Sequence, residues 1–139
     1  MKRLTLLGAT GSIGLRTLEI VSSFPEDFQV AGLAARGSNV ELIADLCHKY
    51  SPRAVALLDA GAADRLARLL APPRPELLAG PEGLVALTRD VPADVVVSAL
   101  VGAAGLLPTM AGILAGRTVA LANKETLVMA GSLMTAAAP

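Results

Sequence analysis

The feature that most constrains the fold is a repeated pattern in which a short apolar run is followed by a segment with helical spacing. The apolar runs, rich in Val and Leu, predict strands at Arg3–Gly8, Phe28–Ala34, Ala54–Leu58, Glu76–Ala79, Asp94–Leu100 and Thr118–Ala122. The segments between and after them predict helices at Ser12–Ser23, Asn39–Tyr50, Ala60–Ala71, Pro81–Thr88, Leu106–Leu114 and Lys124–Ala137. Nearly continuous apolarity is expected of parallel strands covered on both faces, and short connections indicate right-handed βαβ units. The sequence therefore predicts an α/β fold with a doubly wound, mostly parallel sheet in a single domain.

Composition indicates a core that needs neither disulfides nor metal. Of the 139 residues, 53% are hydrophobic and 17% are charged, which excludes intrinsic disorder.

The stretch from Val95 to Gly116 carries no charge and is long enough to span a bilayer. Its glycines and Pro108 favour instead a strand, a glycine turn and a short buried helix, so we expect no membrane segment.

Charge and cysteine content narrow the possible partners. Twelve basic residues balance twelve acidic ones, so the electrostatic footprint of a nucleic-acid binder is missing. The single cysteine, Cys47, cannot form an internal disulfide, and the first apolar run ends at Gly8, too early for a signal-peptide core. We expect a cytoplasmic protein that binds neither nucleic acid nor membrane.

A glycine-rich segment joins the first predicted strand to the first predicted helix. In Gly8-Ala9-Thr10-Gly11-Ser12-Ile13-Gly14, the three glycines permit a tight turn and a close approach of backbone amides to a pyrophosphate. The spacing is a variant of the dinucleotide-binding fingerprint, and no Gly-Lys-Ser/Thr follows, which excludes a P-loop. A purely structural turn is the alternative, but the position between strand and helix favours a nucleotide-binding, Rossmann-like domain.

The end of the second predicted strand indicates which nicotinamide nucleotide binds. An acidic residue commonly holds the ribose 2′-hydroxyl of NAD at this position. Here the strand continues into Arg36-Gly37-Ser38-Asn39, which contains no carboxylate. The Arg36 guanidinium and the polar hydrogens of Ser38 and Asn39 suit a 2′-phosphate, so we expect NADP rather than NAD. In the alternative interpretation Arg36 is a solvated loop residue and Asn39 or Ser38 caps the next helix, and both roles of Asn39 are compatible.

A third polar group follows the last predicted strand. Asn123, Lys124 and Glu125 present an amide, an ammonium and a carboxylate at the carboxyl end of a buried strand, where open α/β sheets bind their ligands. These groups suit the orientation of a cofactor ring and a polar substrate. An ordinary helix start with Asn123 as its cap is the alternative.

Four segments together resemble the 1-deoxy-D-xylulose 5-phosphate reductoisomerase family. They are Leu7–Gly14, Asn39–Leu42, Val101–Leu106 and Ala120–Gly131, and the last is the most specific. The resemblance extends over the whole chain and identifies it with the N-terminal NADPH-binding domain, residues 1–139. Many family members have a shorter second turn with Lys directly before the Asn, whereas Arg36 and Ser38 occupy that neighbourhood here.

The resemblance implies an NADPH-dependent oxidoreductase of the methylerythritol phosphate route to isoprenoids. Such enzymes rearrange the sugar phosphate 1-deoxy-D-xylulose 5-phosphate and reduce the product to 2-C-methyl-D-erythritol 4-phosphate, with a divalent cation, Mg or Mn, on the substrate oxygens. The family is typically homodimeric. By matching motif, the implied cofactor-binding residues are Thr10, Gly11, Ser12, Ile13, Arg36, Gly37, Ser38, Asn39, Asn123 and Glu125, and the implied substrate-binding residue is Lys124.

In the family, the metal ligands, one Asp and two Glu, follow the Asn-Lys-Glu block, and a C-terminal helical domain comes later. The sequence stops at Pro139, and Asp90 and Asp94 lie at the wrong end of the predicted sheet to replace those ligands. We therefore expect no catalytic and no metal-binding residue in this chain, and an isolated chain that binds cofactor without turnover.

Two other functions are compatible with the same motifs. One is half of another NADP-dependent dehydrogenase, and the other is a non-catalytic NADP(H)-sensing module with a protein partner.

Cys47 and His48 are adjacent on a predicted helix and do not share a site. Arg65 and Arg68, at helical spacing among Ala and Leu, are interpreted as a solvated face.

Overall fold

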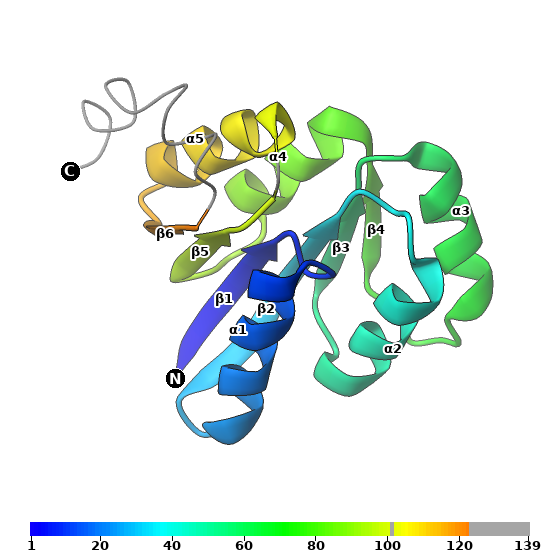
Figure 1. Cartoon of the computed structure of the whole chain (residues 1–139), viewed down its shortest axis with the longest axis horizontal. Helices are drawn as coiled ribbons and strands as arrows, with labels where there is room; N and C mark the ends of the chain where they lie inside the picture. Colours follow the sequence, from blue (N-terminus) through cyan, green and yellow to red (C-terminus); the bar gives the residue numbers. More distant parts are fainter. Residues whose placement is uncertain (101, 123–139) are drawn as a thin grey trace.

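The structure, a computed structural model, describes residues 1–100 and 102–122 and has one parallel sheet (Figure 1). The strands are β1 (Lys2–Leu7), β2 (Phe28–Ala35), β3 (Ala54–Leu57), β4 (Glu76–Ala79), β5 (Val95–Ser98) and β6 (Thr118–Leu121). They lie in the order β4-β3-β2-β1-β5-β6, and every neighbouring pair is parallel. The predicted doubly wound, Rossmann-like fold is confirmed.

Helices connect consecutive strands, as the periodicity predicts. They are α1 (Ser12–Ser23), α2 (Val40–Tyr50), α3 (Ala60–Leu69), α4 (Gly80–Asp90) and α5 (Leu106–Leu114), with a 3-10 turn, η1 (Ala103–Gly105), before α5. The predicted strand and helix boundaries within the described residues agree with these to within two residues. The predicted helix Lys124–Ala137 lies outside the described residues.

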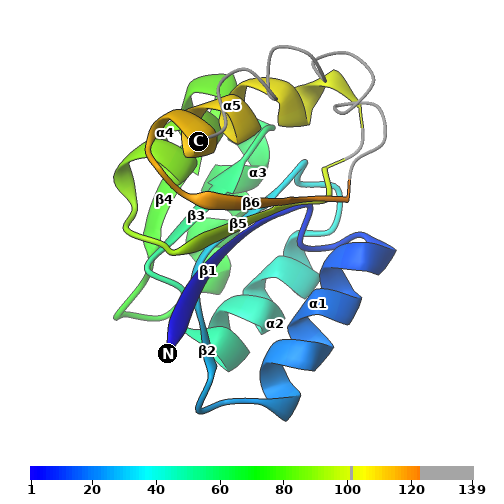
Figure 2. The ribbon, with the colours of Figure 1, turned by 90° about the vertical axis from the view of Figure 1, so that its left-hand side faces the viewer.

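The helices form a layer on each face of the sheet. Because side chains alternate along a strand, Leu4 and Leu6 of β1 join the core cluster formed with α1, α2 and α3, whereas Leu7 joins the cluster formed with α4. Figure 2 shows α1 and α2 on one side of the sheet and α4 and α5 on the other. The buried residues of both clusters are Ala, Val and Leu, with Ile43 and Cys47 in the first, as the scarcity of aromatic residues predicts.

The uncharged stretch from Val95 to Gly116 forms β5, η1 and α5. A buried hydroxyl pair fastens this segment to the sheet: Ser98 Oγ and Thr109 Oγ1 lie 2.7 Å apart, and Thr109 Oγ1 also donates to the Gly105 carbonyl. The interpretation as strand, turn and short helix is confirmed, but the helix is buried on one face only, since Leu107 and Leu114 are exposed. Within residues 1–100 and 102–122, no helix is long and apolar enough to span a bilayer.

The chain changes direction at the centre of the sheet. From β1 to β4 each new strand adds on one side of β1, and β5 and β6 then add on the other side. The carboxyl ends of β1 and β5 therefore border a topological switch point, where open α/β sheets bind ligands. The glycine-rich segment after β1 begins at this point.

Candidate functional site

The glycine-rich loop turns sharply where β1 ends. Gly8 has a φ of +90°, a conformation that L side chains rarely adopt, and its amide donates to the Ala34 carbonyl at 2.8 Å. A Cβ at Gly8 would lie 2.5 Å from the Ala99 carbonyl oxygen after β5. The loop therefore lies directly between the ends of β1, β2 and β5.

The other two glycines of the loop have different surroundings. A Cβ at Gly14 would overlap the Gly8 carbonyl oxygen and approach the Ala9 backbone to 3.0 Å, so the packing of α1 on the loop requires glycine there. A Cβ at Gly11 would meet only the Gly8 carbonyl oxygen, at 3.6 Å, which is ordinary van der Waals contact. Gly11 is exposed; its amide donates to the Gly8 carbonyl at 3.2 Å and its carbonyl accepts the Leu15 amide at 2.9 Å, so what is open is the space that a side chain would fill.

The amino end of α1 suits an anion. Its cap residue, Gly11, has an extended backbone and no side-chain capping bond, and no acidic residue lies in the first turn. The first amides of any helix lack a partner within that helix, and they carry a partial positive charge. By contrast, Asn39 caps α2 and Asp59 caps α3 with their side chains. The amides of Ser12 and Ile13 at the start of α1 are thus available to the phosphate oxygens of a nucleotide.

A cavity of about 120 Å³ brings the first two motifs together. Gly8, Thr10 and Gly11 line it from the loop, and Arg36 and Ser38 line it from the turn after β2. The remaining lining comes from Ala35 and from Ala99 and Leu100 after β5. The structure thus brings the expected pyrophosphate and 2′-phosphate residues to one edge of the sheet.

The turn after β2 is held by α2 and α3. Asn39 Oδ1 accepts a hydrogen bond from the Leu42 amide at 3.2 Å, so the capping role of Asn39 is observed. Gly37 has a φ of +109°, and a Cβ there would lie 2.5 Å from Ala62 Cβ, so the turn packs against the first turn of α3. Arg36 and Ser38 remain exposed on the cavity side of this turn.

Two charged residues beside this turn were missed by the sequence analysis. Asp59 and Arg65 line a cavity of about 410 Å³ together with Arg36, Gly37, Ser38 and Leu58. The interpretation of Arg65 as part of a solvated face is incomplete, because this exposed side chain borders the candidate site. Since β3 lies beside β2, residues that follow the two strands meet at one edge, and a sheet order would have revealed the proximity.

The expected nicotinamide and substrate residues, Asn123, Lys124 and Glu125, lie outside the described residues. The preceding residue, Ala122, donates its amide to the Ser98 carbonyl at 2.8 Å. The described part of the chain therefore continues to the carboxyl edge of the sheet, the edge that also carries the glycine-rich loop.

Other titratable groups lie away from this edge. Burial raises the pKa of the Cys47 thiol to about 11, so it is a core residue and not a nucleophile. Asp94 pairs with Arg3 at the amino edge of the sheet, as expected for a position far from the site. In the described ranges, no group of three or more His, Cys, Asp and Glu side chains is arranged to hold a metal ion.

The parallel, doubly wound sheet and the glycine-rich turn before an uncapped helix at the switch point define a domain of the Rossmann type, a fold that commonly binds dinucleotides. The model of one protein family, 1-deoxy-D-xylulose 5-phosphate reductoisomerase, matches residues 4–131. The chain belongs to this family.

Relatives with this name are closely similar. The chain is 55% identical over 134 residues to the reductoisomerase of Geobacter metallireducens and 50% identical over 135 residues to that of Pelodictyon phaeoclathratiforme. The alignments cover 96% and 97% of this chain but 35% of each relative. The chain thus spans about a third of the length of the relatives that it matches.

Solved structures agree with this assignment. The reductoisomerase from Zymomonas mobilis in complex with NADPH superimposes with a TM-score of 0.91 at 40% identity, over 98% of this chain and 35% of that one. A DOX-P reductoisomerase in complex with magnesium has a TM-score of 0.93 at 37% identity, over 99% of this chain and 34% of that one.

Proposed function

We propose that residues 1–139 are the NADPH-binding domain of an enzyme that rearranges 1-deoxy-D-xylulose 5-phosphate and reduces the product to 2-C-methyl-D-erythritol 4-phosphate. The observation that carries this proposal is the cavity shared by the glycine-rich loop, the turn after β2 and the end of β5. Family membership and the NADPH complex of the Zymomonas mobilis relative support it. Family membership also favours this reaction over that of another NADP-dependent dehydrogenase.

The pyrophosphate of NADPH would lie against Thr10, Gly11, Ser12 and Ile13. The open space beside Gly11 fits such a group, because apart from its chain neighbours only the Gly8 carbonyl oxygen lies within 4 Å of the position that a Cβ would occupy. The amides at the start of α1 would donate to the phosphate oxygens, and the hydroxyls of Thr10 and Ser12 are further donors.

The adenosine 2′-phosphate would lie against the 36–39 turn. The Arg36 guanidinium can donate two parallel hydrogen bonds to phosphate oxygens, and the Ser38 hydroxyl and Gly37 amide are neutral donors. Because the Asn39 amide oxygen already accepts the Leu42 amide, its amide nitrogen is the group that would face the phosphate. Capping and binding then use different atoms of the same side chain.

The remaining assignments rest on the matching motif. Asn123 and Glu125 would hold the nicotinamide end of NADPH, which supplies a hydride when bound, and Lys124 would bind the sugar phosphate. We assign the Mg or Mn ion of the family to none of the described residues, among which no three His, Cys, Asp and Glu side chains are grouped to hold a metal ion. A cytoplasmic homodimer is the proposed state of the full-length enzyme.

Titration of the purified chain with NADPH and with NADH tests the proposal. We expect NADPH to bind at least about tenfold more tightly, because charge-assisted hydrogen bonds to the 2′-phosphate have no counterpart in NADH. Equal affinities, or no binding by a chain with a cooperative thermal transition, would contradict it. An NADP(H)-sensing module would bind through the same residues, so turnover of deoxyxylulose phosphate by the full-length protein separates that alternative.

A further inference from the structure

We propose that Arg65 of α3 is a second cation for the 2′-phosphate of NADPH and a determinant of the preference for NADPH over NADH. The inference rests on the proposed function, because it takes the dinucleotide to lie across the glycine-rich loop and the 36–39 turn. Arg65 belongs to none of the three sequence motifs, and it lies outside the turn after β2.

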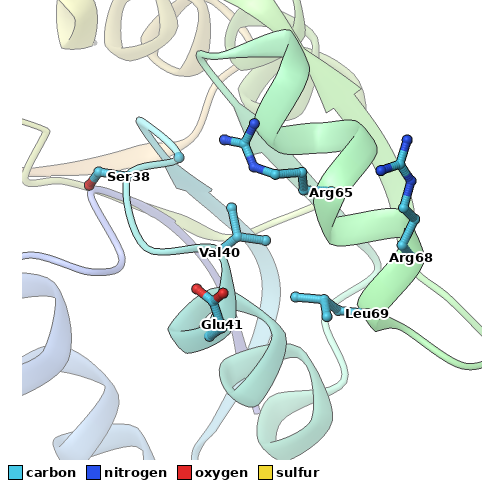
Figure 3. Close-up of a pocket in the computed structure, with 7 residues that line it drawn as sticks. Ser38, Val40, Glu41, Arg65, Arg68 and Leu69 are labelled. Carbon is cyan, nitrogen blue, oxygen red and sulfur yellow. The ribbon is translucent and has the colours of Figure 1, made fainter.

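Arg65 lies between two cavities that meet at Ser38. It lines the cavity of about 410 Å³ with Arg36, Gly37 and Ser38, and it also lines a cavity of about 450 Å³ with Gly37, Ser38 and Arg68. Figure 3 shows the Arg65 guanidinium directed from α3 toward the turn that carries Ser38. A phosphate beside Ser38 would therefore lie between guanidinium groups from two different elements.

The backbone holds α3 against this turn. The Asp59 amide donates to the Arg36 carbonyl at 3.0 Å, and the Leu58 amide donates to the Ala35 carbonyl, also at 3.0 Å. With the packing of Gly37 on Ala62, these bonds fix the position of α3 relative to the turn. Arg65 follows Ala62 by three residues, so it lies on the same side of the helix.

The charges that line the 410 Å³ cavity explain why a second arginine is needed. Asp59 contributes one carboxylate, which by itself would cancel Arg36 and repel a phosphate dianion. Arg65 leaves the cavity with one net positive charge. Its ion pair with Asp59 is long, at 3.7 Å, and the two side chains are 55% and 60% exposed, so the pair is weak. The guanidinium is held nearby and retains donors for a phosphate.

Arg68 provides a matched control on the same helix. It lines the 450 Å³ cavity but is not among the residues that line the 410 Å³ cavity. In Figure 3 its guanidinium is not directed toward Ser38. Arg65→Ala and Arg68→Ala therefore remove the same charge from the same helix at two distances from the expected phosphate.

The test measures the affinities of NADPH and NADH for the wild-type chain, Arg65→Ala, Arg65→Lys and Arg68→Ala. We expect Arg65→Ala to lower the affinity for NADPH by about 10- to 100-fold and to change the affinity for NADH by less than about twofold, because only NADPH carries the 2′-phosphate. Arg65→Lys retains the charge but loses the planar fork, so its loss should be intermediate. Arg68→Ala should change either affinity by less than about threefold, since its charge is more distant and screened.

A second pair of variants separates direct contact from simple neutralisation of Asp59. Asp59→Asn retains the side-chain oxygen that accepts the Gly61 amide and removes the negative charge. If Arg65 contacts the phosphate, Arg65→Ala combined with Asp59→Asn binds NADPH more weakly than Asp59→Asn alone. Equal affinities of these two variants would overturn the proposal.

Two further outcomes distinguish a failure of this inference from a failure of the proposed function. A wild-type chain that prefers NADPH, with an unchanged preference in Arg65→Ala or an equal loss in Arg68→Ala, overturns the role of Arg65 and leaves the proposed function intact. A wild-type chain that binds NADPH and NADH equally overturns the proposed function, on which this inference rests. Thermal melts of each variant confirm folding, which we expect because Arg65 is exposed.

Discussion

The carboxyl and amino edges of the sheet use their polar groups differently. At the amino edge, Asp94 accepts the Arg3 amide at 2.8 Å, and Tyr50 Oη donates to the Leu18 carbonyl at 3.0 Å. Arg117 donates to the Arg89 carbonyl in the last turn of α4 and to the Val91 carbonyl directly after that helix. These groups pair within the protein and connect one element to the next.

At the carboxyl edge, polar groups of the glycine-rich loop and of the 36–39 turn line adjoining cavities, whereas the amino-edge cavity of about 360 Å³ is lined by Tyr50 and Ser22, which bond to each other. Gly11 begins α1 without a side-chain cap, and Arg36 and Ser38 line spaces of about 120 and 410 Å³. The difference follows from the parallel topology, because the helix that follows each strand begins at the carboxyl edge with unpaired amides and ends at the amino edge with carbonyls. Anions are therefore favoured at the first edge, and cations such as Arg117 at the second. The comparison predicts that ligand affinity depends on the carboxyl edge and that the amino edge contributes only stability.

The largest effect is expected for two alanine substitutions in the glycine-rich loop. Gly14→Ala should lower the free energy of unfolding by about 3 kcal/mol, because its Cβ would overlap the Gly8 carbonyl and core overpacking costs about that much. Gly11→Ala should leave the free energy of unfolding within about 0.5 kcal/mol, because its Cβ would meet the Gly8 carbonyl oxygen only at van der Waals distance. It should weaken NADPH binding at least about tenfold, because that Cβ would lie where we propose that the pyrophosphate binds. Urea unfolding and NADPH titration of both variants measure this separation, and a Gly11→Ala chain with wild-type affinity would contradict it.

The next effect concerns the double role of Asn39. Asn39→Asp retains the oxygen that caps α2 and adds a negative charge to the first turn of that helix, so stability should not fall. The same charge would repel the 2′-phosphate, so the affinity for NADPH should fall by about tenfold and the affinity for NADH by much less. Titration with both nucleotides, beside a thermal melt, measures the two roles. An equal loss of affinity for NADPH and for NADH would show that the substitution distorts the site and does not act through its charge.

A smaller effect is expected at the amino edge. Tyr50→Phe removes the hydroxyl that bonds to the Leu18 carbonyl and lies 2.7 Å from Ser22 Oγ, and it should lower the free energy of unfolding by about 1 kcal/mol. NADPH affinity should not change. A reduced affinity in this variant would show that the two edges are coupled.

The smallest effect is a pH dependence at Asp94. The Arg3 amide, followed by the Arg3 guanidinium and the charge of Lys2, holds the pKa of Asp94 below its ordinary value. A carboxyl with a lowered pKa contributes stability above the unfolded pKa, near 3.9, and loses it as the pH falls through the folded value. The difference in Tm between the wild-type chain and Asp94→Asn should therefore be largest above about pH 5 and shrink below about pH 4. A difference that is constant from pH 3 to 6 would contradict this.

Much of the fold was predictable because local periodicity and burial agree along this chain. The β4 and α1 boundaries match the prediction, since apolar runs between polar turns determine where a strand begins and ends. The positions of the glycine-rich loop and Arg36 at the carboxyl edge of the sheet were also predictable, because each directly follows a strand. Asp59 and Arg65 were not, because the residues after β2 and β3 become neighbours only when the two strands pair.

The sequence by itself determined the βα alternation, the composition of the core and the glycine-rich turn between β1 and α1, because these depend on residues close together in the chain. Only the tertiary structure decided that Arg65 borders the same cavity as Arg36 and that Gly11 is open whereas Gly14 is packed. Such properties depend on distances between segments remote in sequence, and these distances are set by strand order and helix packing rather than by local preference.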